Sequence, residues 1–124
     1  MAKVARIGDR VQGGFCYYAW RWHHTTYYCG WWYPGTVGTI IQGSPDVKAN
    51  GIGMARYGDM VQHDYNPSAP YPHDDKGYIL TCSSTVEANG KGVARIGDTC
   101  GPMGGSGLFY YATIYQGSPD VEAA

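Results

Sequence analysis

Asn50-Gly51-Ile52-Gly53-Met54-Ala55-Arg56-Tyr57-Gly58-Asp59 is the stretch of sequence that decides this fold, because its second half recurs along the chain. Ala-Arg-(Ile/Tyr)-Gly-Asp is found again at residues 5–9 and 94–98. A second motif, Gln-Gly-Ser-Pro-Asp-Val, occurs at residues 42–47 and 116–121, with a degraded copy at 81–86. Self-similarity of this kind is the signature of a repeat architecture, with a fixed frame and connecting loops of variable length.

Asn-Gly pairs join the two motifs in two of the copies, at Asn50-Gly51 and Asn89-Gly90. A type I′ turn needs positive φ at both central residues, which Asn and Gly adopt most readily, so Asn-Gly is a strong hairpin signal. The sequence therefore predicts two β-hairpins, which pair residues 47–49 with 52–54 and residues 86–88 with 91–93.

The third hairpin is predicted from the two ends of the chain. In the repeat frame, Ala124 aligns with Asn50 and Met1 aligns with Gly51. Residues 120–123 would then pair with residues 2–5 and close a pseudo-threefold ring. The alternative is an open β array with frayed ends. The ring is favoured because the two chain ends align with the two residues of the Asn-Gly turn.

Composition supports one all-β domain over residues 1–124. Nineteen Gly and seven Pro favour turns over long helices, and twelve Tyr and four Trp favour strands. A net charge of -1 gives no general attraction to nucleic acid, and no apolar run is long enough to span a bilayer. We expect three β-hairpin repeats with little helix and with long variable loops at about 10–38, 60–77 and 99–112.

Metal-binding side chains gather in these loops. All four histidines lie there: His23 and His24 in the first loop, His63 and His73 in the second. Imidazole and thiolate groups on three convergent loops suggest one tetrahedral zinc site, although the spacing by itself favours solvent-exposed histidines. Neighbouring residues on a strand face opposite sides, so only one of His23 and His24 would reach an interior metal.

The four cysteines fall into two kinds. Cys16, Cys29 and Cys100 lie in the loops, whereas Cys82 aligns with the glycines at 43 and 117 of the repeat frame. We therefore expect Cys82 to pack as a small buried residue and not to bind metal.

The first loop is rich in aromatic residues. Tyrosine pairs at 17–18 and 27–28 lie almost symmetrically about the two histidines, which suggests a β-hairpin with the histidines near its tip. Cys16 and Cys29 would flank the base of that hairpin and could form a disulfide. The tryptophans at 20, 22, 31 and 32 suit either a carbohydrate-stacking surface or a local hydrophobic cluster, and we favour the cluster.

No set of catalytic residues is apparent. Asp9, Asp59 and Asp98 recur at equivalent positions, which is typical of turn-forming residues and not of a single acid–base pair. The sequence contains neither a Gly-x-Ser-x-Gly elbow nor a phosphate-binding loop. We therefore expect that the protein is not an enzyme.

The repeat resembles the PAAR family, which is named for a Pro-Ala-Ala-Arg motif and whose frame reads roughly Asn-Gly-x-x-Ala-Arg-x-Gly-Asp, then a loop, then Gly-Ser-Pro-x-Val. Here Gly-Met-Ala-Arg (53–56) and Gly-Val-Ala-Arg (92–95) replace the literal motif. The resemblance implies a conical β domain that caps the trimeric β-helix spike of a contractile injection system, with one copy per trimer.

The resemblance also implies a structural zinc near the apex, held by three His and one Cys, with iron possible. His63, His73 and Cys100 match the family's ligands by position. The family's first-loop histidine would fall near Gly13 and Gly14, so His23, His24 or Cys16 would have to substitute.

The expected function is that of a structural tip protein that sharpens the spike and helps to pierce the target envelope, with transient contact and no stable membrane insertion. We favour the distal end of a phage tail baseplate, in the virion, because no effector domain is apparent and the loops are elaborated. The alternatives are a tip protein secreted by a type VI system and a tip module that binds a glycan or receptor.

Overall fold

The structure of the chain is a computed structural model that describes residues 1–13, 15–21, 24–30, 36–63, 76–103 and 108–124, and the side chains of residues 1–13, 38–62, 76–101 and 112–124. The described residues form strands and turns and contain no helix, hence none long and apolar enough to cross a membrane. The strands are β1 (Ala2–Lys3), β2 (Arg10–Gly13), β3 (Phe15–Arg21), β4 (His24–Gly30), β5 (Thr36–Ile40), β6 (Lys48–Ala49), β7 (Ile52–Gly53), β8 (Met60–His63), β9 (Lys76–Ile79), β10 (Glu87–Ala88), β11 (Lys91–Gly92), β12 (Thr99–Met103), β13 (Leu108–Ile114) and β14 (Glu122–Ala123). The all-β expectation is confirmed.

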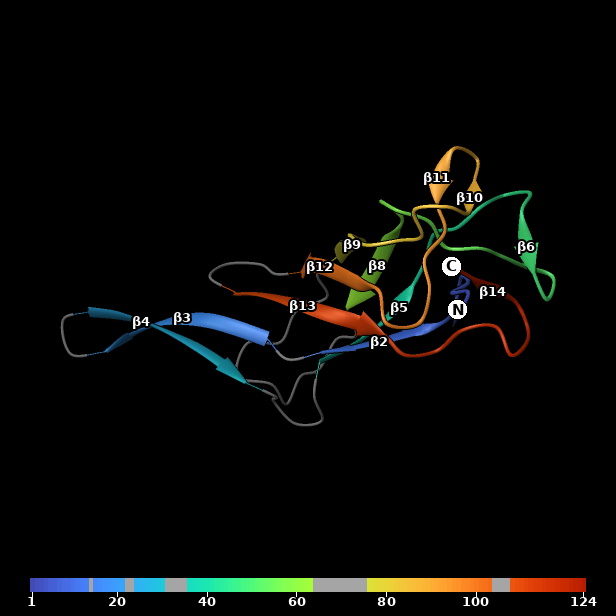
Figure 1. The fold of residues 1–124 in the computed structure, drawn as a ribbon. Coiled ribbons are helices and arrows are strands. Elements are labelled where there is room, and N and C mark those ends of the chain that lie inside the picture. The colour runs from blue at the N-terminus through green and yellow to red at the C-terminus, as the bar shows by residue number, and fades with distance from the viewer. Residues whose placement is uncertain (14, 22–23, 31–35, 64–75, 104–107) are drawn as a thin grey trace.

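Three short hairpins form one end of the molecule, as the repeat predicts (Figure 1). β6 pairs with β7 and β10 pairs with β11, each across an Asn-Gly turn with positive φ at both residues, 55° at Asn50 and 76° at Gly51 in the first. The third hairpin joins the two ends of the chain, because Ala2 pairs with Ala123 and Lys3 with Glu122. The closed ring is therefore confirmed.

A triangle of backbone hydrogen bonds lies at the centre of the ring. The N–H groups of Ala5, Ala55 and Ala94 donate to the carbonyls of Ala94, Ala5 and Ala55 respectively, each at 2.9 Å. All three alanines are fully buried. Because each repeat bonds to both of the others, the three hairpins form a single base.

A closed six-stranded antiparallel barrel stands on this base, in the order β12–β9–β8–β5–β2–β13 with β13 returning to β12 (Figure 1). Its strands are the stems of the three segments that the sequence indicated only as variable loops. The two stems of a repeat are separated by a segment of variable length, as when Arg10 pairs with Thr39, so no common local turn signal marked them.

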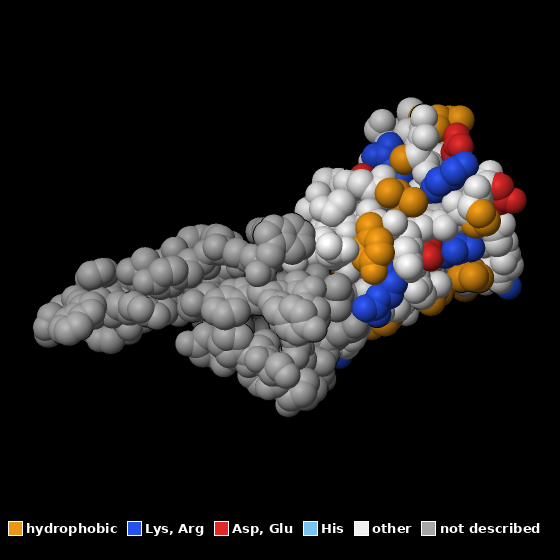
Figure 2. Space-filling view, turned by 90° about the horizontal axis from the view of Figure 1, so that it is seen from below, with side chains coloured by type: hydrophobic (Ala, Val, Ile, Leu, Met, Phe, Trp, Pro, Cys, Tyr) orange, Lys and Arg blue, Asp and Glu red, His pale blue; other side chains and the backbone are white. Residues whose placement is uncertain are grey.

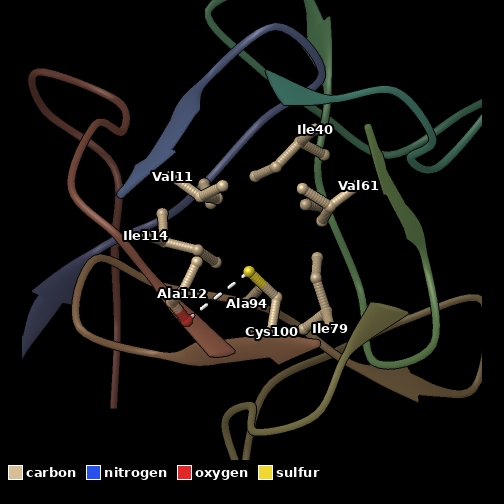
Figure 3. Packing of buried hydrophobic residues seen from close by; sticks show 10 residues of the cluster. Val11, Ile40, Val61, Ile79, Ala94, Cys100, Ala112 and Ile114 are labelled. Carbon is tan, nitrogen blue, oxygen red and sulfur yellow. Dashed lines mark hydrogen bonds between the residues drawn. The ribbon is translucent and has the colours of Figure 1, made fainter. Parts of the chain in front are cut away.

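Near the base, six apolar side chains fill the interior of the barrel at one level. Val11, Val61 and Cys100 come from the first stem of each repeat, and Ile40, Ile79 and Ile114 come from the second (Figure 3). All six side chains are fully buried.

The next level of the barrel, away from the base, carries small residues. The second stems present Gly38, Gly77 and Ala112 there, two residues before the isoleucines, and all three are buried. A Cβ on Gly38 would lie only 2.6 Å from the backbone oxygen of Gln62, so the strands approach too closely for a larger residue.

The aromatic segment forms the predicted hairpin. β3 pairs with β4 from Phe15↔Gly30 to Arg21↔His24, and β3 also pairs with β13 through two residues. In Figure 1 this hairpin projects from the barrel on the side opposite the three short hairpins. The long hairpin and the Asn-Gly turns thus lie at opposite ends of the described part of the molecule.

Candidate functional site

Each repeat contains an arginine–aspartate pair that fixes the turn leading into the barrel. In the second repeat, Asp59 Oδ2 accepts hydrogen bonds from the backbone N–H of Arg56 at 2.8 Å and from its Nε at 3.0 Å, while Oδ1 accepts from Nη2 at 3.0 Å. The hydrogen bond to Asp59 raises the pKa of Arg56. The same pairing recurs at Arg6–Asp9 and Arg95–Asp98. The repeated acids therefore organise turns, as the sequence indicated.

A polar corner ties neighbouring repeats together at the base. Asn89, in its turn, accepts from Arg56 Nη1 at 3.0 Å and from Ser44 Oγ at 2.6 Å, and its Nδ2 donates to Asp46 Oδ1 at 2.8 Å. Ser44 Oγ also accepts from the N–H of Val47 at 2.8 Å. The hydrogen bonds from Asn89 and then Ser44 lower the pKa of Asp46.

A second corner repeats this arrangement. Asn50 accepts from Arg6 Nη1 at 3.2 Å and donates to Asp120 Oδ1 at 2.8 Å, and Ser118 Oγ accepts from the N–H of Val121 at 2.9 Å. Asn50 and Ser118 lower the pKa of Asp120, in that order of effect.

The third corner has lost part of the network. Ser83 still accepts from the N–H of Val86 at 2.9 Å, but Thr85 stands where the other repeats have aspartate, and Ala124 stands where they have the turn asparagine. The degraded motif at 81–86 was the sequence signal of this change. The base is therefore threefold in its backbone and asymmetric in its polar side chains.

The hairpins of the base enclose a second apolar cluster. Its buried members are Val4, Ala49, Ala88, Val93 and Ala123, with Val47, Met54 and Val121 partly buried against them. Ile52 and Val86 on the hairpins remain exposed. Figure 2 shows hydrophobic side chains distributed among charged ones over the described end of the molecule.

Cys82 lies at the third corner and is half-buried, more open than expected. Its Sγ and Ser83 O approach Gly92 so closely that a Cβ there could not fit. Cys82 occupies a position where the other two repeats have glycine, and it is one of several positions at which the third corner differs from the repeat frame.

Cys100 lies inside the barrel, at the repeat-equivalent position to Val11 and Val61 (Figure 3). Its thiol donates to the carbonyl of Ala112 at 3.5 Å. Burial raises its pKa to about 12, which the hydrogen bond to Ala112 opposes only in part. Without a bound cation, the sulfur is therefore a neutral thiol in an aliphatic setting at neutral pH.

The other candidate metal ligands are placed only by their backbone, or lie outside the described residues. His63 ends β8, two residues after Val61 and hence on the same face of the strand, and pairs with Gly38. His24 begins β4, at the end of the long hairpin remote from the barrel (Figure 1). His23 and His73 fall outside the described residues. Positions 63 and 100 thus belong to the same barrel, and position 24 does not.

Among residues with described side chains, no group of three or more His, Cys, Asp or Glu is arranged to hold a metal ion. Above the Cys100 level, however, the barrel carries only glycine and alanine on its second stems. The histidine at position 63 lies on a strand that passes this level.

Comparison with protein families gives one match: the model of the PAAR motif aligns with residues 33–105. This span covers more than half of the chain and includes the second repeat with both of its flanking motifs. Comparison with curated proteins found no significant match.

Proposed function

Because the chain belongs to the PAAR motif family, whose members sit on spike proteins, we propose that it is the structural tip of the spike of a contractile injection machine. It would cap and sharpen a trimeric β-helix spike, with one copy per trimer. The base built from three short hairpins would face the spike, and the barrel with its long aromatic hairpin would point toward the target envelope.

The observation that carries this proposal is the pseudo-threefold base. A trimeric spike ends in three equivalent surfaces, and a single chain can contact all three only if it presents three similar surfaces itself. The closed triangle of Ala5, Ala55 and Ala94 places three hairpins around one axis in this way. A cap would also cover the open strand edges at the end of the spike, which otherwise invite aggregation.

Apolar side chains on the hairpins supply contacts for such a partner. Ile52 in β7 and Val86 just before β10 are each 38% exposed on the hairpin end. Packing them against the last turn of the spike would remove further apolar surface from water, which stabilises the complex.

The first experiment is native mass spectrometry of the full chain with its cognate spike protein. We expect one chain per spike trimer. Three chains per trimer would overturn the symmetry argument, and a complete lack of binding would overturn the cap.

Paired variants test which face binds. Val86→Glu should weaken binding about tenfold or more, because it buries a carboxylate at the contact. Tyr78→Glu is the matched control, because Tyr78 is similarly exposed, at 48%, but lies on the barrel wall in β9. Equal losses for the two variants would contradict the assignment of the base as the contact face, provided that both keep the circular dichroism spectrum of the wild type.

We favour a phage tail baseplate as the setting, with the protein in the virion, over secretion by a type VI system. The elaborated aromatic hairpin at the far end of the barrel suits a part that meets the target envelope first. The contact with the envelope would be transient. No catalytic role is proposed, because the three repeated aspartates are engaged in turn-forming pairs.

A structural zinc, or iron, remains part of the proposal. His63, His73 and Cys100 would hold it, together with His23 or His24. Position 63 lies on a barrel strand that passes the level above Cys100, which favours a site there, whereas the aliphatic neighbours of Cys100 and its two valine equivalents favour a packing role for that sulfur. When bound, the metal would pin the loops together and stabilise the apex.

Measurement of the metal content of the purified protein tests whether the metal site exists. We expect one zinc or iron per chain in the wild type and a loss in His63→Ala and His73→Ala, with Gln62→Ala as the neighbouring control. Wild-type protein without stoichiometric metal would overturn the metal site and leave the cap intact.

A second candidate function follows from the long hairpin, which projects away from the barrel. Positions 18, 20 and 27 alternate onto one of its faces, so two tyrosines and a tryptophan could stack against a sugar. Glycan-array binding that is lost in Trp20→Ala but kept in Thr26→Ala, on the other face, would support recognition of a glycan.

A further inference from the structure

We propose that Cys16 and Cys29 form a disulfide that locks the base of the β3–β4 hairpin. This inference concerns the aromatic hairpin alone and does not depend on the proposed function. It rests on the backbone register of the two strands, on the position of the hairpin in the sheet, and on the environment of the other two cysteines.

The register places the two cysteines directly opposite each other, because Cys16 and Cys29 are partners in the β3–β4 pairing. Residues that face each other across an antiparallel pair lie on the same side of the sheet. A shift of one residue in either strand would put the two cysteines on opposite sides.

The number of residue pairs between the turn and the two cysteines also shows which kind of antiparallel pair they form. It is the non-hydrogen-bonded kind, in which the two Cα atoms lie closer together. Arg21 and His24 are partners separated by two residues, and such a pair must exchange both of its backbone hydrogen bonds. Hydrogen-bonded and non-hydrogen-bonded pairs then alternate away from the turn. Counting back five pairs from Arg21↔His24 makes Cys16↔Cys29 a non-hydrogen-bonded pair.

Non-hydrogen-bonded pairs bring their Cα atoms to about 4.5 Å, against about 5.5 Å in hydrogen-bonded pairs. Disulfides occur at Cα separations of about 4.4–6.8 Å. The pair thus sits at a position where a cross-strand disulfide can close without moving the backbone, and the hairpin supplies that position through its register alone.

The location in the sheet explains what the bond would do. β4 is the edge of the eight-stranded sheet and pairs only with β3 among the described strands. Among the described strands of the barrel, β3 pairs only with β13, at Tyr17↔Leu108 and Cys16↔Phe109. A two-stranded hairpin is only marginally stable by itself, so the stretch beyond Tyr17 needs an added constraint to keep its register. A bond between Cys16 and Cys29, one pair before the last β3 residue that pairs with β13, supplies that constraint.

The other two cysteines are poor competitors for either member of the pair. Cys100 is fully buried inside the barrel, where its sulfur is out of reach of an oxidant or of another cysteine. Cys82 lies at the third corner of the base, against Gly92, at the end of the molecule opposite the long hairpin.

The bond would form by thiol–disulfide exchange with a small or protein disulfide as the oxidant. The thiolate of one cysteine attacks the oxidant and releases one of its sulfurs as a thiol, and the second cysteine then displaces the other sulfur. Two cysteine thiols become one disulfide, and the oxidant takes up two electrons and two protons to become two thiols. The bond would be absent in a reducing cytoplasm and would form in an oxidising compartment or outside the cell.

Trypsin provides a direct test, because its cleavage sites place the four cysteines in four different peptides: 11–21, 22–48, 77–91 and 96–124. Cleavage after Arg21, at the turn of the hairpin, separates Cys16 from Cys29 unless a disulfide joins their peptides. The full chain is equilibrated with reduced and oxidised glutathione, alkylated, digested without reductant and analysed by mass spectrometry. We expect peptides 11–21 and 22–48 to be found linked, with the cysteines of the other two peptides alkylated after unfolding.

A register-shifted variant is the matched control. Cys29→Ser combined with Tyr28→Cys keeps the number of thiols and the same tryptic peptides but moves one thiol to the opposite face of the hairpin. Its equilibrium constant for oxidation by glutathione should fall about tenfold or more relative to the wild type. The proposal is overturned if peptides 11–21 and 22–48 stay separate in the wild type, if either joins the peptide of Cys82 or Cys100, or if the shifted variant oxidises as readily as the wild type.

Discussion

Replacement of Asp59 by asparagine tests how far the arginine–aspartate pairs hold the fold together. Asp59 accepts three hydrogen bonds from Arg56, one from its backbone N–H and two from its guanidinium. The side chains are 3% and 12% exposed, so water can do little to replace the lost charge. Asparagine keeps the shape of the side chain and removes the charge.

Loss of one partner from a buried ion pair costs about 3–5 kcal/mol, because the remaining charge is left uncompensated. Arg56 retains some access to water and a hydrogen bond to Asn89, which argues for the lower end, about 3 kcal/mol. At about 4 °C per kcal/mol for a chain of this size, Tm should fall by about 12 °C. Thermal unfolding followed by circular dichroism measures the shift.

Glu122→Gln is the matched control, because it makes the same chemical change in the exposed Lys3–Glu122 pair, and we expect little effect on Tm. If the cost of Asp59→Asn comes from an orphaned guanidinium, adding Arg56→Met should restore part of the lost stability. The reasoning fails if Asp59→Asn shifts Tm no more than Glu122→Gln does, or if the second substitution only adds to the loss.

Three further outcomes are expected. Cys100→Val should change the free energy of unfolding by less than about 1.5 kcal/mol, because both repeat-equivalent positions carry valine; a larger loss in urea titration, or a loss of bound metal, would favour the ligand role for this sulfur. Gly51→Val should cost about 1–3 kcal/mol, because φ is 76° there, and an unchanged urea midpoint would contradict the turn assignment. The pKa values of Asp46 and Asp120 are lowered below the usual 3.8, so their contribution to stability is complete above that pH and is lost as the pH falls through the lowered values. The double variant Asp46→Asn, Asp120→Asn should therefore show a flatter fall of Tm below about pH 4 than the wild type. A Tm profile parallel to that of the wild type would refute this.

The sequence by itself determined the parts of this protein that depend on local conformation. An Asn-Gly pair accepts positive φ at both positions, so Asn50-Gly51 and Asn89-Gly90 specify their hairpins wherever the rest of the chain lies. The repeated frame then fixed the register at which the two ends of the chain meet. The nearly symmetric tyrosine pairs predicted the aromatic hairpin and put Cys16 and Cys29 at its base, and the structure shows the two cysteines as direct partners in the register.

Only the tertiary structure decided which residues meet around the threefold axis. The barrel closes through pairs far apart in the chain, so the stems of three segments of unequal length gave no common local signal. Closure places Cys100 among valines and isoleucines, brings position 63 to the same barrel and leaves position 24 at the far end of the hairpin. It also converts three Ala-Arg-x-Gly-Asp copies into one hydrogen-bonded triangle, because each alanine N–H finds its acceptor in a different repeat.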